Sequence, residues 1–92
     1  MARVVYSVRA RRSLQEIALF IAERDRDAAK RLVQDIRRRL DDVLSVFPEA
    51  GTNAEGGRRS FVMRRHTVVY RYDAERDEVV VIEVFGPGMD WR

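Results

Sequence analysis

The chain has 92 residues, of which 46% are hydrophobic and 36% charged, with a formal net charge of +3 and no cysteine. This length predicts one domain over residues 1–92, and the lack of cysteine excludes disulfides, thiolate metal ligands and cysteine nucleophiles. All basic residues except Lys30 are arginine, whose planar guanidinium suits phosphate and carboxylate, so nucleic acid or an acidic protein segment is the expected kind of partner.

The sequence shows no segment for membrane insertion. The N-terminal stretch MARVVYSVRARR has only five residues between charges, which is too short for the apolar region of a signal peptide. No apolar run approaches the length of a membrane span. We therefore expect a cytoplasmic protein with no membrane partner.

The first half of the chain predicts a strand and then a helical hairpin. Arg3–Val8 is rich in β-branched residues, which favour a strand, and the Ser7 hydroxyl could cap the helix that follows. Apolar residues recur at spacings of three and four over residues 10–24 and again over 28–47, as in amphipathic helices. An aspartate in the link Asp25–Asp27 could cap the second helix.

The second predicted helix carries opposite charges four residues apart on its solvent side and ends at Pro48. The run of three arginines at 37–39 is therefore interpreted as a solvated helix face rather than a nucleic-acid patch. The three predicted pairs are Asp35–Arg39, Arg37–Asp41 and Arg38–Asp42.

The second half predicts a loop and three strands. Glu49–Gly57 is rich in glycine and small polar residues, and we expect it to be the most mobile segment, where a partner would be admitted. β-Branched and aromatic runs then predict strands at Arg58–Arg64, Thr67–Tyr72 and Glu78–Phe85, with a tight turn near Arg65–His66. The expected fold class is α+β, in the order β-α-α-β-β-β, with the helix hairpin packed on a mostly antiparallel four-stranded sheet.

Residues 58–72 hold five arginines, one histidine and no acid. These arginines suit contact with phosphate or with the acids of a partner protein. The competing interpretation is that these arginines serve solubility and pair across strands with Glu78 or Glu83. For His66, a turn residue with a local hydrogen bond is favoured over a catalytic base.

Three stretches carry a resemblance to a known family: YSVRARRSLQEIALFIAE, GGRRSFVMRRHTVVYRYD and VVVIEVFGPGMDW. Together they resemble the ParE/RelE superfamily of bacterial type II toxins, and the ParE branch most closely, over nearly the whole chain. The resemblance implies a toxin that inhibits DNA gyrase and is neutralised by direct binding of a ParD-like antitoxin in a hetero-oligomer. It implies contact with operator DNA only through the antitoxin, and no cofactor or metal.

The alternative within the same superfamily is a RelE-like, ribosome-dependent mRNA endoribonuclease. Cleavage of RNA needs an acid–base pair and cations on the charged phosphorane, and for this alternative the candidates are Arg58, Arg64, His66 and Arg71. Gly86 stands where many relatives carry a histidine after the last strand, and Thr67 where a ribosome-dependent nuclease would place an arginine. These departures favour a binding toxin over an enzyme, and no catalytic residue is assigned. A third interpretation is an inactive relative that acts only as the antitoxin's partner in autoregulation.

Two sets of binding residues follow from this interpretation. The apolar face of the first helix exceeds what a two-layer domain needs, so a partner segment could lie in a groove there, with its acids meeting the arginines. Trp91 in the glycine-led tail either packs back on the domain or anchors a partner. The antitoxin-binding candidates are Leu14, Ile17, Phe20, Ile21, Arg58 and Arg71, and the target-binding candidates are Arg59, Arg64, Arg65, Asp90, Trp91 and Arg92.

Overall fold

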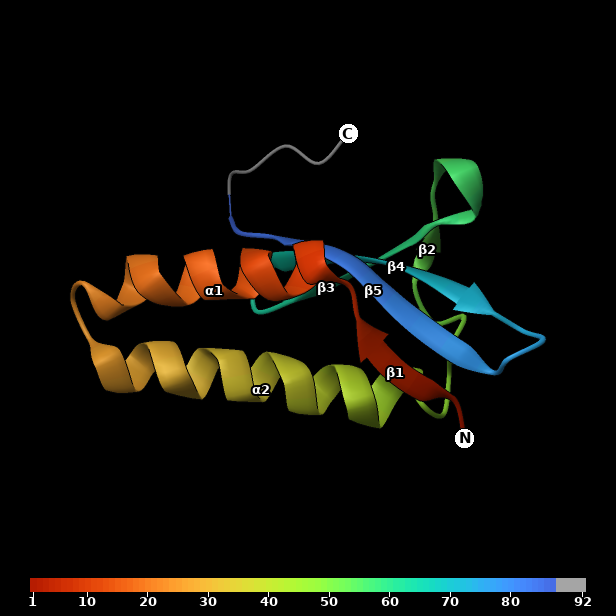
Figure 1. Cartoon of the computed structure of the whole chain (residues 1–92), viewed down its shortest axis with the longest axis horizontal. Helices are drawn as coiled ribbons and strands as arrows, with labels where there is room; N and C mark the ends of the chain where they lie inside the picture. The colour runs from red at the N-terminus through yellow and green to blue at the C-terminus, as the bar shows by residue number, and fades with distance from the viewer. Residues whose placement is uncertain (88–92) are drawn as a thin grey trace.

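The computed structural model describes residues 1–87 and arranges them as an antiparallel pair of helices packed against a mixed sheet (Figure 1). This confirms the predicted α+β class. No helix within residues 1–87 is long and apolar enough to cross a membrane. The elements in chain order are β1 (Arg3–Tyr6), α1 (Val8–Ala22), α2 (Arg26–Leu44), β2 (Thr52–Asn53), the short 3₁₀ turn η1 (Glu55–Gly57), β3 (Arg59–Met63), β4 (His66–Asp73) and β5 (Glu78–Phe85).

The first helix begins at the predicted cap Ser7, and the second at Asp25, one of the two aspartates of the predicted link. The side chain of Ser7 accepts a hydrogen bond from the amide of Ala10 at 3.0 Å, and that of Asp25 accepts one from Ala28 at 3.0 Å. The predicted extension of the first strand to Val8 is wrong, because the cap at Ser7 places Val8 in the first turn of α1.

The second helix ends earlier than predicted. Leu44 is its last residue and is fully buried, whereas Val46 and Phe47 are exposed. The carbonyl of Ser45 accepts a hydrogen bond from the amide of Ala2 at 2.8 Å. Leu44 is thus the last residue of this helix that packs in the core. The carbonyl that follows it bonds to the N-terminal segment of the chain.

The sheet has five strands in the order β1-β5-β4-β3-β2, with β1 parallel to β5 and the other pairs antiparallel. The predicted count of four is wrong because β2 forms inside the expected irregular loop. Thr52 pairs with Ser60 and Asn53 with Arg59. A two-residue strand has no alternation pattern of its own, so it arises only from pairing with β3.

The tight turn between β3 and β4 lies one residue earlier than predicted. Arg64 and Arg65 occupy its two central positions with φ values of 49° and 65°, and Met63 pairs with His66 across it. Positive φ at both central residues is the geometry of a type I′ hairpin turn. His66 is therefore the first residue of β4, not a turn residue.

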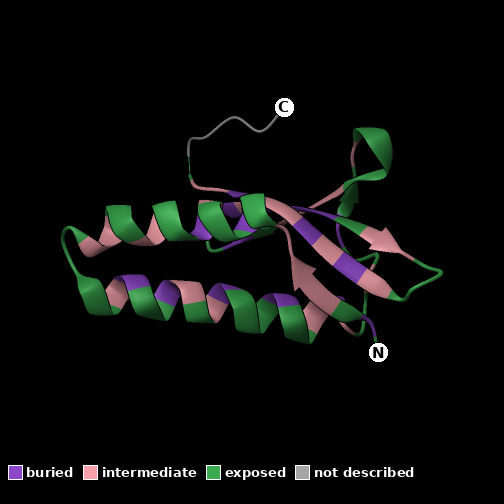
Figure 2. Cartoon of the chain, in the orientation of Figure 1, coloured by how far each residue is buried: buried purple, intermediate pink, exposed green. Residues whose placement is uncertain are grey.

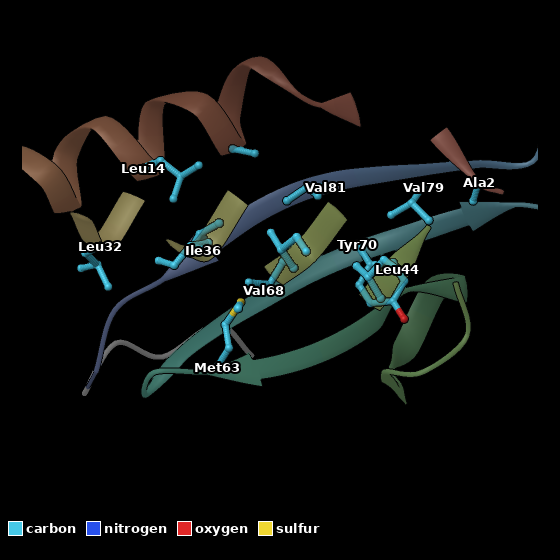
Figure 3. Packing of buried hydrophobic residues seen from close by; sticks show 13 residues of the cluster. Ala2, Leu14, Leu32, Ile36, Leu44, Met63, Val68, Tyr70, Val79 and Val81 are labelled. Atoms are coloured by element: carbon cyan, nitrogen blue, oxygen red, sulfur yellow. The ribbon is translucent and has the colours of Figure 1, made fainter. Parts of the chain in front are cut away.

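The core lies between the helices and one face of the sheet (Figure 3). Both helices bury residues on the side facing the sheet and expose the opposite side (Figure 2). Along β4, Val68 and Tyr70 belong to this buried cluster, so the alternate residues, such as Arg71, point to the other face of the sheet. The cluster includes Leu14, Leu32, Ile36, Leu40, Leu44, Met63, Val68, Tyr70, Val79, Val81 and Val84.

Of the three predicted ion pairs on α2, Asp35–Arg39 is present at 3.6 Å. The other two arginines reach different partners. Arg38 lies 4.0 Å from Asp35, and the guanidinium of Arg37 lies 5.0 Å from the centre of the Tyr6 ring. A tertiary contact with β1 thus replaces the expected local pair of Arg37.

Candidate functional site

Arg64 in the β3–β4 turn and Arg59 in β3 both make contacts within the fold. Arg64 lies 3.1 Å from the carboxylate of Asp35, which ties the β3–β4 turn to α2. Arg59 donates to the carbonyls of Glu49 and Gly51 at 3.2 and 2.9 Å and pairs with the Glu49 carboxylate at 3.0 Å. Both side chains are therefore engaged in contacts that position a turn and a loop.

Arg58 and Arg71 form a second group on the sheet face away from the helices. Arg58 comes just before β3, and the register that pairs Arg59 with Tyr70, continued by one residue, places it opposite Arg71. Arg58 donates to the carbonyl of Glu55 at 3.2 Å and Arg71 to that of Gly56 at 3.4 Å. Within residues 1–87, neither guanidinium has a carboxylate within 4.0 Å.

The predicted pairing of strand arginines with Glu78 or Glu83 is wrong. Glu78 pairs with Arg3, which lies directly opposite it in the β1–β5 register. Glu83 pairs with Arg9 of α1 at 3.4 Å. Both glutamates therefore serve the contacts of β5 with the N-terminal part of the chain.

His66 is buried, at 6% exposure, and its Nδ1 lies 2.7 Å from the carbonyl oxygen of Arg64. This is the local hydrogen bond that the sequence favoured. His66 and Arg71 are five positions apart in one strand, so their side chains lie on opposite faces. The structure therefore does not bring together the four nuclease candidates, Arg58, Arg64, His66 and Arg71. No group of side chains in the described part of the chain could hold a metal ion.

A groove of about 560 Å³ runs between α1 and the end of the sheet where β5 finishes. Ile17 and Ile21 are half-buried along it, and Phe20 at its edge is 74% exposed. Leu14 is only 2% exposed and packs in the core, so this predicted antitoxin contact is not available on the surface. The groove, here called the α1 groove, is lined by Ser13, Glu16, Ile17, Phe20, Ile21, His66, Glu83, Val84, Gly86 and Pro87.

A second hollow of about 630 Å³ continues from the α1 groove toward the start of α1. It shares Ser13, Glu16 and Glu83 with the groove and adds Val8, Arg9 and Arg12. The apolar part of this surface thus lies at the C-terminal half of α1, and the charged part at its N-terminal half.

The sequence singled out only part of this site. The periodicity of α1 identified Ile17 and Ile21, and Phe20 was a candidate because it lies off the middle of that apolar stripe. Nothing local indicated that His66, Glu83 and Pro87 would line the same groove. Arg65 has no carboxylate within 4.0 Å in the described residues. The remaining target candidates, Asp90, Trp91 and Arg92, lie outside the described residues.

Comparison with known proteins places this geometry in context. Residues 4–91 match the family model of the ParE toxin of the type II toxin–antitoxin system parDE. None of the curated proteins matches the chain.

Solved structures share the fold at low sequence identity. The chromosomal ParDE system from P. aeruginosa matches with a TM-score of 0.78 and 18% identity, covering 95% of this chain and 97% of the other. The RelBE2 toxin–antitoxin complex from Mycobacterium tuberculosis matches with a TM-score of 0.73 and 21% identity, covering 96% and 93%. The intact E. coli RelBE complex matches with a TM-score of 0.68 and 15% identity, covering 97% and 100%.

Proposed function

Because the chain belongs to the family of ParE toxins of type II toxin–antitoxin systems, we propose that it inhibits DNA gyrase and that a ParD-like antitoxin neutralises it by direct binding. The match of residues 4–91 to the family model carries the proposal, and the fold shared with the ParDE system of P. aeruginosa supports it. In this proposal the protein is a single-domain cytoplasmic toxin that meets operator DNA only through the antitoxin.

The arrangement of the polar side chains suits a toxin that acts by binding. Arg59 and Arg64 are engaged within the fold, and His66 lies on the opposite sheet face from Arg71. A binding toxin needs a complementary surface rather than an assembled acid–base pair. Arg65 lies in the β3–β4 turn next to Arg64, and unlike Arg64 it has no carboxylate within 4.0 Å in the described part of the chain. We assign it to the target-binding surface together with Asp90, Trp91 and Arg92.

The antitoxin occupies the α1 groove in this proposal. Phe20 is 74% exposed beside the half-buried Ile17 and Ile21. Burying a side chain such as Phe20 at an interface is worth about 1.5–3 kcal/mol. An amphipathic helix whose apolar face enters a hydrophobic groove is a common mode of peptide recognition. The antitoxin therefore presents an apolar stripe to α1.

The test is a supercoiling assay with purified gyrase, relaxed plasmid and ATP, with and without the protein. We expect loss of supercoiling with cleaved plasmid trapped on the enzyme, and reversal by the antitoxin. Arg65→Ala is expected to weaken inhibition, whereas Val62→Ala, on an exposed strand residue with no assigned role, is the matched control. Undisturbed supercoiling at a large excess of folded protein contradicts the proposal.

One observation favours a second candidate, the ribosome-dependent mRNA endoribonuclease. Arg58 and Arg71 stand opposite one another when the β3–β4 register is continued by one residue, and neither has a carboxylate partner in the described residues, so the two guanidinium groups are available to hold a phosphate. The test is cleavage of an mRNA on translating ribosomes. Cleavage by the wild type that is lost in the variant carrying both Arg58→Ala and Arg71→Ala supports the nuclease, and intact mRNA contradicts it.

A further inference from the structure

The polar side chains that line the α1 groove offer acceptors rather than donors. Glu16 and Glu83 are carboxylates, which only accept when ionised. The hydroxyl hydrogen of Ser13 is already donated to the carbonyl of Arg9 at 2.9 Å. His66 is the fourth polar side chain in the lining, and its role depends on which ring nitrogen carries the hydrogen.

The contact of His66 with Arg64 assigns that hydrogen. A carbonyl oxygen can only accept, so the Nδ1 that lies 2.7 Å from the Arg64 carbonyl must be the donor. In the neutral ring Nε2 is then left with a lone pair. No hydrogen bond is made to Nε2 within residues 1–87, and this nitrogen is not among the buried atoms that lack a partner. The ring is 6% exposed and lines the groove, so Nε2 is accessible.

The two carboxylates in the lining differ in their own partners. Glu83 pairs with Arg9 at 3.4 Å, whereas Glu16 has no cation within 4.0 Å in the described part of the chain. A partner segment that lies in the groove next to Glu16 would therefore bind more tightly if it carried a positive charge there. This local preference is opposite to the one that the net charge of +3 suggests for the whole chain.

From these observations we propose that the α1 groove selects a partner segment that carries hydrogen-bond donors. An aromatic side chain of this segment donates a polar hydrogen to Nε2 of His66, and a neighbouring cation pairs with Glu16. Tyrosine and tryptophan combine an apolar ring with such a hydrogen. The inference rests on the proposed function, since it specifies the antitoxin segment that enters the groove. The antitoxin segment next to His66 and Glu16 therefore carries an aromatic and a basic side chain rather than an acidic one.

Small molecules test the chemistry without the antitoxin. Tyramine carries the aromatic hydroxyl and the cation, O-methyltyramine lacks the donor hydrogen, and para-hydroxyphenylpropionate replaces the cation by a carboxylate. Each is titrated into the full-length protein while the imidazole nitrogens of His66 are followed by long-range ¹H–¹⁵N NMR. We expect tyramine to bind saturably and shift the Nε2 resonance. O-methyltyramine should bind about fivefold more weakly, the effect of one hydrogen bond, and para-hydroxyphenylpropionate more weakly than tyramine.

Variants separate the contributions. In His66→Phe the preference for tyramine over O-methyltyramine should disappear, and in Glu16→Gln the preference for the ammonium over the carboxylate should disappear. Phe20→Ala should weaken all three probes while keeping both preferences. If His66→Phe does not fold, the shift of the Nε2 resonance of the wild type on titration with tyramine tests the hydrogen bond instead.

Equal binding of tyramine and its methyl ether, an unmoved Nε2 resonance, or no binding of any probe overturns the inference. Recovery of the protein with a co-expressed antitoxin is measured in parallel. If the antitoxin still binds when the probes fail, the chemistry proposed for the groove is wrong while the proposed function stands. If the antitoxin fails and the probes bind selectively, the groove chemistry stands and the partner is wrong.

Discussion

The phenolic oxygen of Tyr70 accepts a hydrogen bond of 2.8 Å from the amide of Gly51. Tyr70 is fully buried in β4, and Gly51 opens the segment that leads into β2. Burial raises the pKa of Tyr70 above its ordinary value, against the opposing effect of this hydrogen bond. The contact joins the centre of the sheet to the segment Glu49–Gly57, which was predicted to be an irregular loop. It thereby positions β2 beside β3.

Gly51→Ala should destabilise the protein strongly. A Cβ at this position would lie 2.7 Å from the carbonyl oxygen of Ser60 and 2.8 Å from two atoms of Tyr70, and such overpacking costs about 1–3 kcal/mol. The measurement is urea unfolding followed by circular dichroism. Gly57→Ala is the matched control, because its Cβ meets no atom within 4 Å and it tests only the strain of a φ of +73°. An equal loss in both variants would contradict the steric argument.

Tyr6→Phe should leave the free energy of unfolding unchanged or raise it by up to about 1 kcal/mol, because an unpaired buried hydroxyl is costly. The Tyr6 hydroxyl is buried without a hydrogen-bond partner in the described residues, and desolvation raises the pKa of this phenol to about 12. The ring under Arg37 is retained in the variant. Thermal and urea unfolding measure the change, and a clear loss of stability would show that the hydroxyl has a partner.

Asp35 should make the stability depend on pH in the acidic range. Its hydrogen bond with Arg64, helped by Arg39 and Arg38 and opposed by desolvation, lowers the pKa of this carboxyl below the ordinary value of 3.8. A carboxyl with a lowered pKa in the folded state stabilises the fold above its unfolded pKa and loses that contribution as the pH falls through the folded value. The stability difference between wild type and Asp35→Asn should therefore be constant above about pH 5 and shrink below it. A difference that does not change with pH contradicts the ion pair.

Arg65→Gly should stabilise the fold by about 1 kcal/mol, because the left-handed conformation costs a non-glycine residue about that much. Arg65 has a φ of 65° and no carboxylate within 4.0 Å in the described part of the chain. Arg64→Gly relieves a φ of 49° but loses the contact with Asp35 at 3.1 Å, so it should gain less. Urea midpoints of the two variants measure the difference. If Arg65 also contacts the target, Arg65→Gly will be more stable and less toxic.

Phe20→Ser should weaken antitoxin binding at least tenfold while leaving the fold intact, since removal of a buried aromatic side chain costs about 1.5–3 kcal/mol. Phe20 is 74% exposed in the isolated chain, so its loss disturbs little of the core. Val62→Ser is the control, because Val62 is 67% exposed on β3, outside the α1 groove. Isothermal titration with the antitoxin compares the three proteins. Equal weakening by both substitutions would count against the groove as the binding site.

Local signals in the sequence were sufficient for the helices and most strands. The cap at Ser7, and a cap at one of the aspartates of the 25–27 link, could be predicted because a capping side chain bonds to an amide only a few residues away; the structure shows that the second cap is Asp25. The apolar spacing of α1 and α2 indicated their buried faces for the same reason. The strand β2 was missed because its two residues carry no periodic pattern and depend on the contact with β3.

The sequence by itself determined the fold class and the helix hairpin, which rest on patterns within short stretches, and the family resemblance, which rests on the order and spacing of motifs over nearly the whole chain. Only the tertiary structure decided what each charged or polar side chain does. Arg64 meets Asp35, 29 residues away, and His66 faces α1 rather than Arg71. Partners of long polar side chains are set by strand register and helix packing, which bring distant residues within a few ångströms, and no local pattern records those distances.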